Sequence, residues 1–229
     1  MDSDLQEIYR NYAQAYNTIT PYTSCHREIV QQVVSALQGK QKILDAGVGT
    51  GIITRELADP NRIIYGVDLS DAMLSFAHRN LSDLIAQGLV HLSCQDIQEL
   101  TFPDNFFDGI VCINTLYHIK DYQKALCELK RVAKKDSILV LSGPNRDFNL
   151  EKALNHIIED FKKQGIYKEK QNNIETVIEY NKQLASSFMK HFFNANEVVS
   201  LLKETCFSDV LLHHNHAYYG CNYLVVAKS

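Results

Sequence analysis

A glycine-rich turn at residues 45–51 narrows the possible folds of this chain more than any other feature of its sequence. The apolar pair Ile43 and Leu44 before it indicates a short buried strand, and residues 52–58 after it show the pattern of a helix. Glycines at every second position let the main chain turn tightly and let a ligand approach it closely. A strand, a tight turn and a helix in this order are typical of open α/β sheets, which bind nucleotide-like ligands at such turns.

The same alternation of apolar and amphipathic segments continues along the chain. Strands are predicted over residues 63–68, 89–94, 107–113 and 138–141, and near residues 210–212 and 223–226. Helices are predicted over residues 70–81, 122–133 and 194–205, and two more within the first forty residues. Apolar strands that alternate with helices indicate a parallel sheet covered on both faces. We therefore predict the α/β class with a doubly wound sheet.

The length of 229 residues suits one α/β domain with a modest insertion. The lysine-rich, glycine-poor stretch after the fifth predicted strand is interpreted as that insertion, with its lysines on a solvated face or, alternatively, recognising an anion. We expect a single domain in four parts: a helical cap over 1–40, a ligand-binding core over 41–148, a helical insertion or lid over 149–187, and a C-terminal helix with closing strands over 188–229.

Composition and charge exclude several classes of protein. Hydrophobic residues make up 45% of the chain and charged residues 22%, which is ordinary for a globular protein. A formal net charge of -4 gives no overall attraction to a phosphate backbone, so no nucleic-acid partner is predicted. Without a secretory signal or an apolar run near the ~20 residues of a membrane helix, we expect a soluble, cytoplasmic monomer or homodimer with no membrane partner.

Two acids, Asp68 and Asp96, stand at the ends of the second and third predicted strands. Asp68 can accept hydrogen bonds from the hydroxyls of a ribose, and Asp96 can accept one from the amino group of an adenine. With the glycine turn they predict a nucleoside pocket. Only Thr50 separates Gly49 from Gly51, whereas the dinucleotide fingerprint has two residues there, so the spacing disfavours NAD. An NAD-dependent oxidoreductase stays open as an alternative.

Four elements in order resemble the class I S-adenosylmethionine-dependent methyltransferases: residues 44–51, 66–70, 95–96 and 106–111. The resemblance covers about residues 40–145. It implies a Rossmann-like sheet of seven strands, six parallel and one antiparallel, with S-adenosyl-L-methionine as cofactor. It also implies methyl transfer to oxygen, nitrogen or carbon of a small metabolite by in-line displacement. A protein that binds the cofactor without turnover stays open as a second alternative.

The resemblance also implies which residues bind the cofactor, grouped by the part that they would contact. These are Gly47, Gly49 and Gly51 at the methionine portion, Asp45 at its ammonium group, Asp68 at the ribose, Leu69, Ile97 and Asp96 at the adenine, and Asn114 after the fourth strand.

Residues 114–118 are expected to face the methyl acceptor. They depart from the Asn-Pro-Pro-Tyr motif used on nucleobase amines and glutamine side chains, and resemble the Leu-x-His endings of small-molecule methyltransferases such as those of ubiquinone and menaquinone biosynthesis. His118 is the candidate general base because its unperturbed pKa lies near neutrality, and Tyr117 is its catalytic neighbour. A structural or cofactor-pocket role for His118 stays open.

Tyrosines, histidines and cysteines outside these motifs are interpreted separately. Tyr9, Tyr12 and Tyr16 share one helical face and are predicted to contact substrate, with a plain core stripe as the alternative. The histidines near the closing strands lack interleaved cysteines or carboxylates, so no metal site is predicted. The six cysteines form no Cys-x-x-Cys pair and are interpreted as reduced packing residues.

Overall fold

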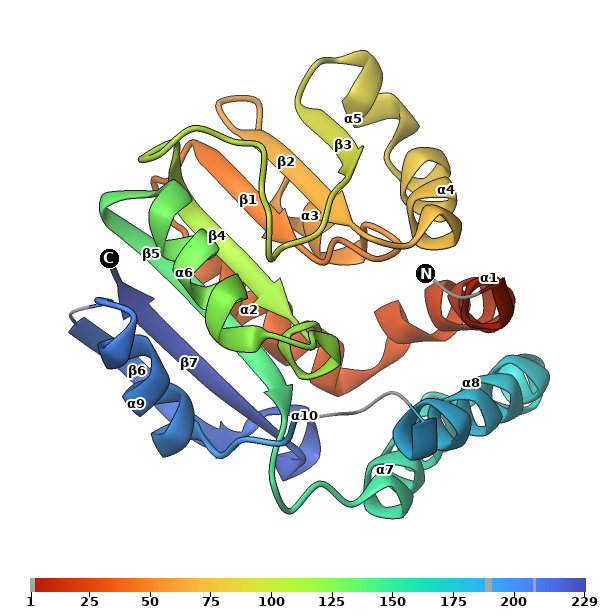
Figure 1. The fold of residues 1–229 in the computed structure, drawn as a ribbon. Helices are drawn as coiled ribbons and strands as arrows, with labels where there is room; N and C mark the ends of the chain where they lie inside the picture. Colours follow the sequence, from red (N-terminus) through yellow and green to blue (C-terminus); the bar gives the residue numbers. More distant parts are fainter. Residues whose placement is uncertain (1–2, 188–190, 208) are drawn as a thin grey trace.

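A mixed seven-stranded sheet runs through the part of the chain that the computed structural model describes, residues 3–187, 191–207 and 209–229 (Figure 1). For residues 3–9, 11 and 183–187 the description covers the main chain only. The strand order is β3-β2-β1-β4-β5-β7-β6, and β7 alone runs antiparallel to both of its neighbours. The strands are β1 Lys42–Ala46, β2 Ile63–Asp68, β3 Val90–Cys94, β4 Phe107–Ile113, β5 Ala133–Pro144, β6 Asp209–His216 and β7 Asn222–Lys228. The predicted sheet of six parallel strands and one antiparallel strand is confirmed.

The helices occupy the segments between the strands. They are α1 Ser3–Ile19, η1 Thr20–Tyr22, α2 Ser24–Ala36, α3 Ile52–Leu57, α4 Asp71–Asn80, α5 Ser82–Ala86, η2 Leu116–His118, α6 Tyr122–Val132, α7 Leu150–Lys163, α8 Tyr167–Ser187, α9 Ala195–Glu204 and α10 Ala217–Gly220. None of these helices, as far as the structure describes them, is both long and apolar enough to cross a lipid bilayer.

Polar side chains fix where several helices begin. Each accepts a hydrogen bond from a main-chain amide in the first turn, which satisfies a donor that the helix itself leaves unpaired. These caps are Thr23, Ser70, Asp121, Asn149 and Asn194. The cap at Ser70 places the start of α4 directly after the end of β2, as the sequence predicts.

Both faces of the sheet are buried, which explains the continuous apolar strands. Ile110 of β4 packs in the cluster under α6 and α9, whereas its neighbour Val111 packs in the cluster under α2 to α5. In Figure 1, α6 and α9 lie in front of the sheet and α2 lies behind it. Successive side chains of a strand point to opposite faces, so a strand covered on both sides must be apolar throughout.

A separate apolar cluster joins α1 to the two helices that follow β5. Ala15 and Ile19 of α1 pack with Phe161 of α7 and with Ile174 and Val177 of α8. Figure 1 shows these three helices together beyond the ends toward which the parallel strands point. The predicted insertion after the fifth strand is therefore helical, and it covers the edge of the sheet where open α/β folds bind ligands.

β5 and β6 extend furthest beyond their predicted limits. β5 begins at Ala133, five residues before its predicted start. The prediction started too late because polar residues near the beginning of the strand, such as Lys135 and Asp136, interrupt the apolar pattern. β6 continues to His216, so the histidines expected between the closing strands lie within an exposed edge strand. Edge strands carry polar outward side chains, which a search for apolar runs does not recognise.

Candidate functional site

One cavity of about 540 Å³ lies at the carboxyl ends of the parallel strands. The loop after each of four neighbouring strands contributes to its wall: Asp45 and Gly47 with β1, Leu69 with β2, Ile97 with β3 and Asn114 with β4. Its size is that of a small-molecule site. All predicted cofactor residues line it except Gly51.

The glycine turn is held against the end of β2 by main-chain hydrogen bonds. The amides of Gly47 and Val48 both donate to the carbonyl of Val67, at 2.8 and 2.9 Å. Gly47 has φ +86°, and a Cβ at this position would lie 2.1 Å from Oγ1 of Thr115. The loop after β4 thus occupies the space that any side chain here would need.

Gly51 serves packing instead of the cavity. It has φ +81° and forms the N-cap of α3, and a Cβ there would lie 2.6 Å from Cδ1 of Leu81. The alternating glycines therefore have separate causes: the close approach of Thr115 at Gly47, positive φ at Gly49, and close packing against Leu81 at Gly51.

The Asp68 carboxylate ties the glycine turn to the start of α4. Its Oδ2 accepts from the amide of Gly49 and its Oδ1 accepts from the amide of Ser70, both at 2.9 Å. Burial raises the pKa of Asp68, although these amide hydrogen bonds oppose the shift. A carboxylate has about four acceptor positions, so two amides leave capacity for ligand hydroxyls.

Asp45 lies deeper, at the end of β1, with only 3% of its surface exposed. The hydroxyl of Thr54 donates to its Oδ2 at 2.6 Å. Burial, opposed by the Thr54 hydrogen bond and reinforced by the nearby Asp68, raises the pKa of Asp45 to about 6. A cationic ligand group in the cavity would therefore favour the ionised form of Asp45.

The raised pKa of Asp45 predicts a pH-dependent stability. Because this pKa lies above the unfolded value of about 4, the contribution of Asp45 is fully present below pH ~4 and is lost as the pH rises through ~6. We expect the free energy of unfolding of Asp45→Asn, measured relative to that of the wild type, to rise by about 3 kcal/mol between pH ~4 and pH ~8. Urea denaturation of both proteins across this range measures the difference. A difference that does not change with pH would contradict the burial of an ionisable Asp45.

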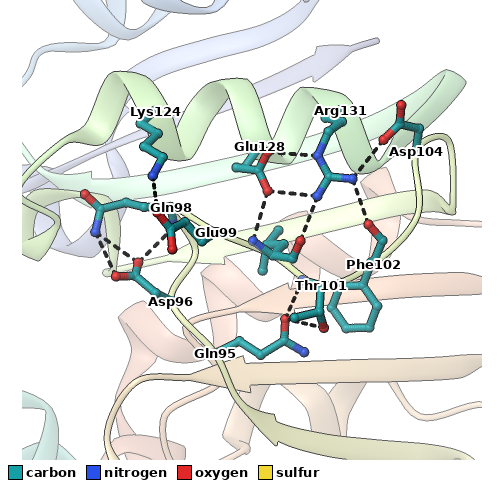
Figure 2. A network of polar contacts seen from close by, with 11 residues as sticks. Gln95, Asp96, Gln98, Glu99, Thr101, Phe102, Asp104, Lys124, Glu128 and Arg131 are labelled. Carbon is teal, nitrogen blue, oxygen red and sulfur yellow. Dashed lines mark hydrogen bonds and ion pairs between the residues drawn. The ribbon is translucent and has the colours of Figure 1, made fainter.

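The loop after β3 is closed on itself around Asp96, as Figure 2 shows. Oδ1 of Asp96 accepts from the amide of Gln98 at 2.9 Å, and both carboxylate oxygens accept from Nε2 of Gln98 at 3.0 Å. Oε1 of Gln95 accepts from the amide of Thr101 at 2.9 Å. These contacts fix the main chain on which Asp96 and Ile97 face the cavity.

Arg131 of α6 anchors the same loop from outside (Figure 2). Its guanidinium donates to the carbonyls of Leu100 and Phe102 at 2.8 and 2.7 Å, to Asp104, and to both carboxylate oxygens of Glu128. Glu128 in turn accepts from the amide of Leu100 at 2.9 Å. The planar guanidinium of Arg131 thus holds two main-chain carbonyls of the loop between β3 and β4.

Removing this anchor should loosen the loop after β3. We expect Arg131→Met to destabilise the protein by about 2 kcal/mol, because two carbonyls and a carboxylate lose a charged donor. Lys124→Met is the matched control on the same helix, since it breaks only the exposed pair with Glu99 and should have a far smaller effect. Urea midpoints compare the two variants. Equal effects would show that the Arg131 network does not anchor the loop.

Tyr117 and His118 lie in the one-turn helix η2 after β4, and both line the cavity. Their rings are 4.0 Å apart between centroids. The preceding Asn114 has φ +53° and accepts from Nδ2 of Asn222 at 2.8 Å. The start of β7 thereby fixes the loop that carries the predicted catalytic pair.

Tyrosines from outside the sheet line the far end of the cavity. Tyr12 and Tyr16 of α1 do so as predicted, with ring centroids 5.2 Å apart. The side chain of Tyr9 lies outside the described residues. Tyr218 and Tyr219, in the turn between β6 and β7, also line the cavity and were not predicted. Neither residue is part of a recognisable motif or helical period, so the sequence offers no signal for them.

The histidines of β6 are not part of this site. His214 and His216 stack with centroids 5.9 Å apart, and the amide of His216 donates to Nδ1 of His214. Neither they nor His213 line the cavity. Within the described residues, no three histidine, cysteine, aspartate or glutamate side chains converge on a possible metal position.

Comparisons with known proteins agree with this geometry. Residues 44–141 match the methyltransferase domain family. The ubiquinone biosynthesis O-methyltransferase of Coxiella burnetii is 30% identical over 146 residues, which are 64% of this chain and 61% of that protein. The demethylmenaquinone methyltransferase of Symbiobacterium thermophilum is 26% identical over 155 residues, 63% of this chain and 61% of that protein. The chain thus spans about three fifths of the length of these relatives.

A solved structure shows the same fold. The magnesium protoporphyrin IX methyltransferase of Synechocystis, crystallised with S-adenosylhomocysteine, superposes with a TM-score of 0.61 at 18% identity, covering 89% of this chain and 83% of that one. The domain match includes the glycine turn and extends to β5, and the sheet has the six parallel strands and one antiparallel strand that the resemblance implies. Residues 44–141 are thus similar in sequence to the methyltransferase domain family, and the chain has the fold of a methyltransferase crystallised with S-adenosylhomocysteine.

Proposed function

We propose that this protein transfers a methyl group from S-adenosylmethionine to an oxygen, nitrogen or carbon of a small molecule. One observation carries the proposal: the glycine turn and three strand-end acids, Asp45, Asp68 and Asp96, line a single cavity. An adenosyl cofactor with a cationic methionine end needs hydroxyl acceptors, an adenine acceptor and a carboxylate in one pocket. This cavity supplies each of them from a different strand end.

The residues present fit that cofactor. Gly47 and Gly49 offer main chain without side chains at the turn, with Asp45 behind it for an ammonium group. Asp68, already oriented by two amides, would receive the ribose hydroxyls. Leu69, 47% exposed at the cavity wall, and Ile97 would cover the two faces of the adenine.

Bound S-adenosylmethionine supplies a methyl group that is already activated on a sulfonium, so the protein needs mainly to position the acceptor and exclude water. Tyr117 and His118 line the cavity from the loop after β4, and we propose that they face the acceptor. In this proposal His118 takes the proton from an acceptor that must lose one. Tyr117 packs against the imidazole ring and limits its rotation.

The proposal assigns parts of one domain to separate tasks. Residues 41–148 bind the cofactor, while the cap over 1–40 and the insertion over 149–187 close over the acceptor as a lid. Their shared apolar cluster, which includes Ile19 and Phe161, supports a joint role for the cap and the insertion. We also propose a cytoplasmic location, since all six cysteines are free thiols in this fold.

The test is methyl transfer itself. The protein is incubated with S-adenosylmethionine carrying an isotopic label on its methyl group and with a fractionated small-molecule extract, and the label is followed by mass spectrometry. The proposal expects the label in a low-molecular-weight product together with S-adenosylhomocysteine. The control is His118→Ala with the same extract. Cofactor binding without transfer to any fraction would favour the non-catalytic alternative.

A further inference from the structure

The cavity continues past the predicted methyl-transfer position into a compartment built outside the matched domain. We define this tyrosine compartment by Tyr12, Tyr16, Ile19, Leu154, Ile157 and Tyr218. Its wall comes from the cap, the insertion and the turn between β6 and β7, three segments brought together only by folding. Beyond the strand ends where the cofactor is proposed to bind, this compartment offers space for a second ligand.

The compartment is aromatic and aliphatic, with hydroxyl groups as its polar features. Among the described side chains that the cap, the insertion and this turn contribute to the cavity, none is lysine, arginine, aspartate or glutamate. Among the lining residues that the structure describes, the acids are Asp45, Asp68 and Asp96 at the strand ends, and the lysine is the exposed Lys120, two positions after His118. An anionic group placed among the tyrosines would lose water without gaining a cationic partner.

Tyr218 reaches this position through an uncommon main chain. Tyr218 has φ +48° and ψ +60°, Tyr219 has φ +59° and ψ +29°, and Gly220 also has positive φ. Left-handed geometry at two successive tyrosines is unfavourable, and such strain collects at functional positions. Asn145 holds the turn in place, because its amide donates to the carbonyl of Cys221 and its Nδ2 to the carbonyl of Gly220.

The two tyrosines of the turn have different surroundings. Tyr219 hydrogen-bonds Asp160 of α7 and accepts from Oγ of Ser24 at 3.2 Å, which fastens the turn to the cap and the insertion. Tyr218 hydrogen-bonds Asn114 at the end of β4. Burial and the neighbouring Tyr16 raise the pKa of Tyr218 well above its ordinary value, so its phenol stays protonated and able to donate. The hydrogen bond joins Tyr218 of the tyrosine compartment to Asn114, one of the predicted cofactor residues on the cavity wall.

We propose that the tyrosine compartment binds an uncharged, largely apolar acceptor, and that the Tyr218 hydroxyl orients the reacting group of this acceptor by a hydrogen bond. The inference rests on the proposed function, which it deepens by naming the acceptor class and a positioning residue. Anionic acceptors of the same size are disfavoured because none of the described side chains of the compartment is a cation that could pair with them.

Three probes of similar shape test it: 2-naphthol, 6-hydroxy-2-naphthoate and naphthalene. Their affinities for the full chain are measured by ligand-observed NMR and fluorescence, with and without S-adenosylhomocysteine. We expect 2-naphthol to bind at least about tenfold more tightly than the carboxylate. We expect Tyr218→Phe to lower the preference for 2-naphthol over naphthalene about fivefold, since only the hydroxylated probe has a hydrogen bond to lose. Tyr22→Phe, an exposed tyrosine outside the cavity, is the control and should change neither ratio.

Each of the opposite outcomes refutes one stated part of the proposal. Equal or tighter binding of the carboxylate, or no binding of 2-naphthol at millimolar concentration, refutes the acceptor class. An unchanged naphthol preference in folded Tyr218→Phe refutes the positioning role, and Tyr218→Leu shows whether the ring alone matters. If 2-naphthol binds as expected but S-adenosylhomocysteine does not, the proposed function fails while the compartment stands as a ligand site.

Discussion

Replacing Gly47 with alanine is expected to destabilise the protein by about 3 kcal/mol and to weaken cofactor binding more than about tenfold. The new Cβ would lie 2.1 Å from Oγ1 and 2.8 Å from Cβ of Thr115. Rotation of the threonine side chain cannot relieve the second contact, so the turn or the loop after β4 must move. Either movement displaces the amides that fix the turn against Val67. Urea denaturation and cofactor titration measure the two effects.

Gly49→Ala is the matched control for this steric argument. Gly49 also has positive φ, but the nearest atom to its Cβ would be the Gly47 carbonyl oxygen at 4.0 Å. We therefore expect only the backbone cost of about 1 kcal/mol. A second control, Gly47→Ala combined with Thr115→Gly, removes the obstructing side chain and should recover part of the stability. If Gly47→Ala were no worse than Gly49→Ala, the close approach of Thr115 would not be what requires glycine.

Replacing Asp68 with alanine is expected to weaken S-adenosylhomocysteine binding by about 2 kcal/mol, or roughly thirtyfold. The carboxylate has two tasks, since it would accept from the ribose and it also holds the amides of Gly49 and Ser70. Burial raises the pKa of Asp68, so removing the charge relieves a desolvation cost that partly offsets the lost hydrogen bonds. Affinity should consequently fall more than stability does.

Calorimetry and thermal denaturation of the same preparations separate these two effects. Asp68→Asn keeps one acceptor oxygen and should give an intermediate affinity. Asp59→Ala is the control, because Asp59 is exposed and does not line the cavity. An Asp68→Ala variant that binds the ligand as tightly as the wild type would refute the ribose assignment.

The sheet and the part of the cavity at the strand ends, around Gly47, Asp68 and Asp96, were predictable from the sequence because both depend on local patterns. Ile63–Asp68 and Phe107–Ile113 are strands at their predicted limits, since their apolar runs are buried on both faces. Acids directly after parallel strands must share one edge of the sheet, so Asp68 and Asp96 lie at one cavity without any long-range information. The role of Gly51 was less accessible, because it depends on Leu81 thirty positions later.

The tyrosine compartment was predictable only in part. Helical periodicity predicted that Tyr12 and Tyr16 share one face of a helix, and both line the cavity. Tyr218 and Tyr219 reach it through a strained turn that no composition rule signals, and through partners as distant as Asp160 and Asn114. The shape of this part of the cavity therefore depends on contacts between separate segments, which single-sequence patterns do not encode.

The central claim is that the turn at Gly47 and the strand-end acids bind an adenosyl sulfonium cofactor. Isothermal titration calorimetry of the unmodified protein with S-adenosylhomocysteine tests it most directly, with NADH as the competing ligand. We predict one ligand per chain, a clear heat with S-adenosylhomocysteine, none with NADH, and a strongly weakened titration for Asp68→Ala. No heat with S-adenosylhomocysteine at millimolar concentration, or saturable binding of NADH in its place, would contradict the account.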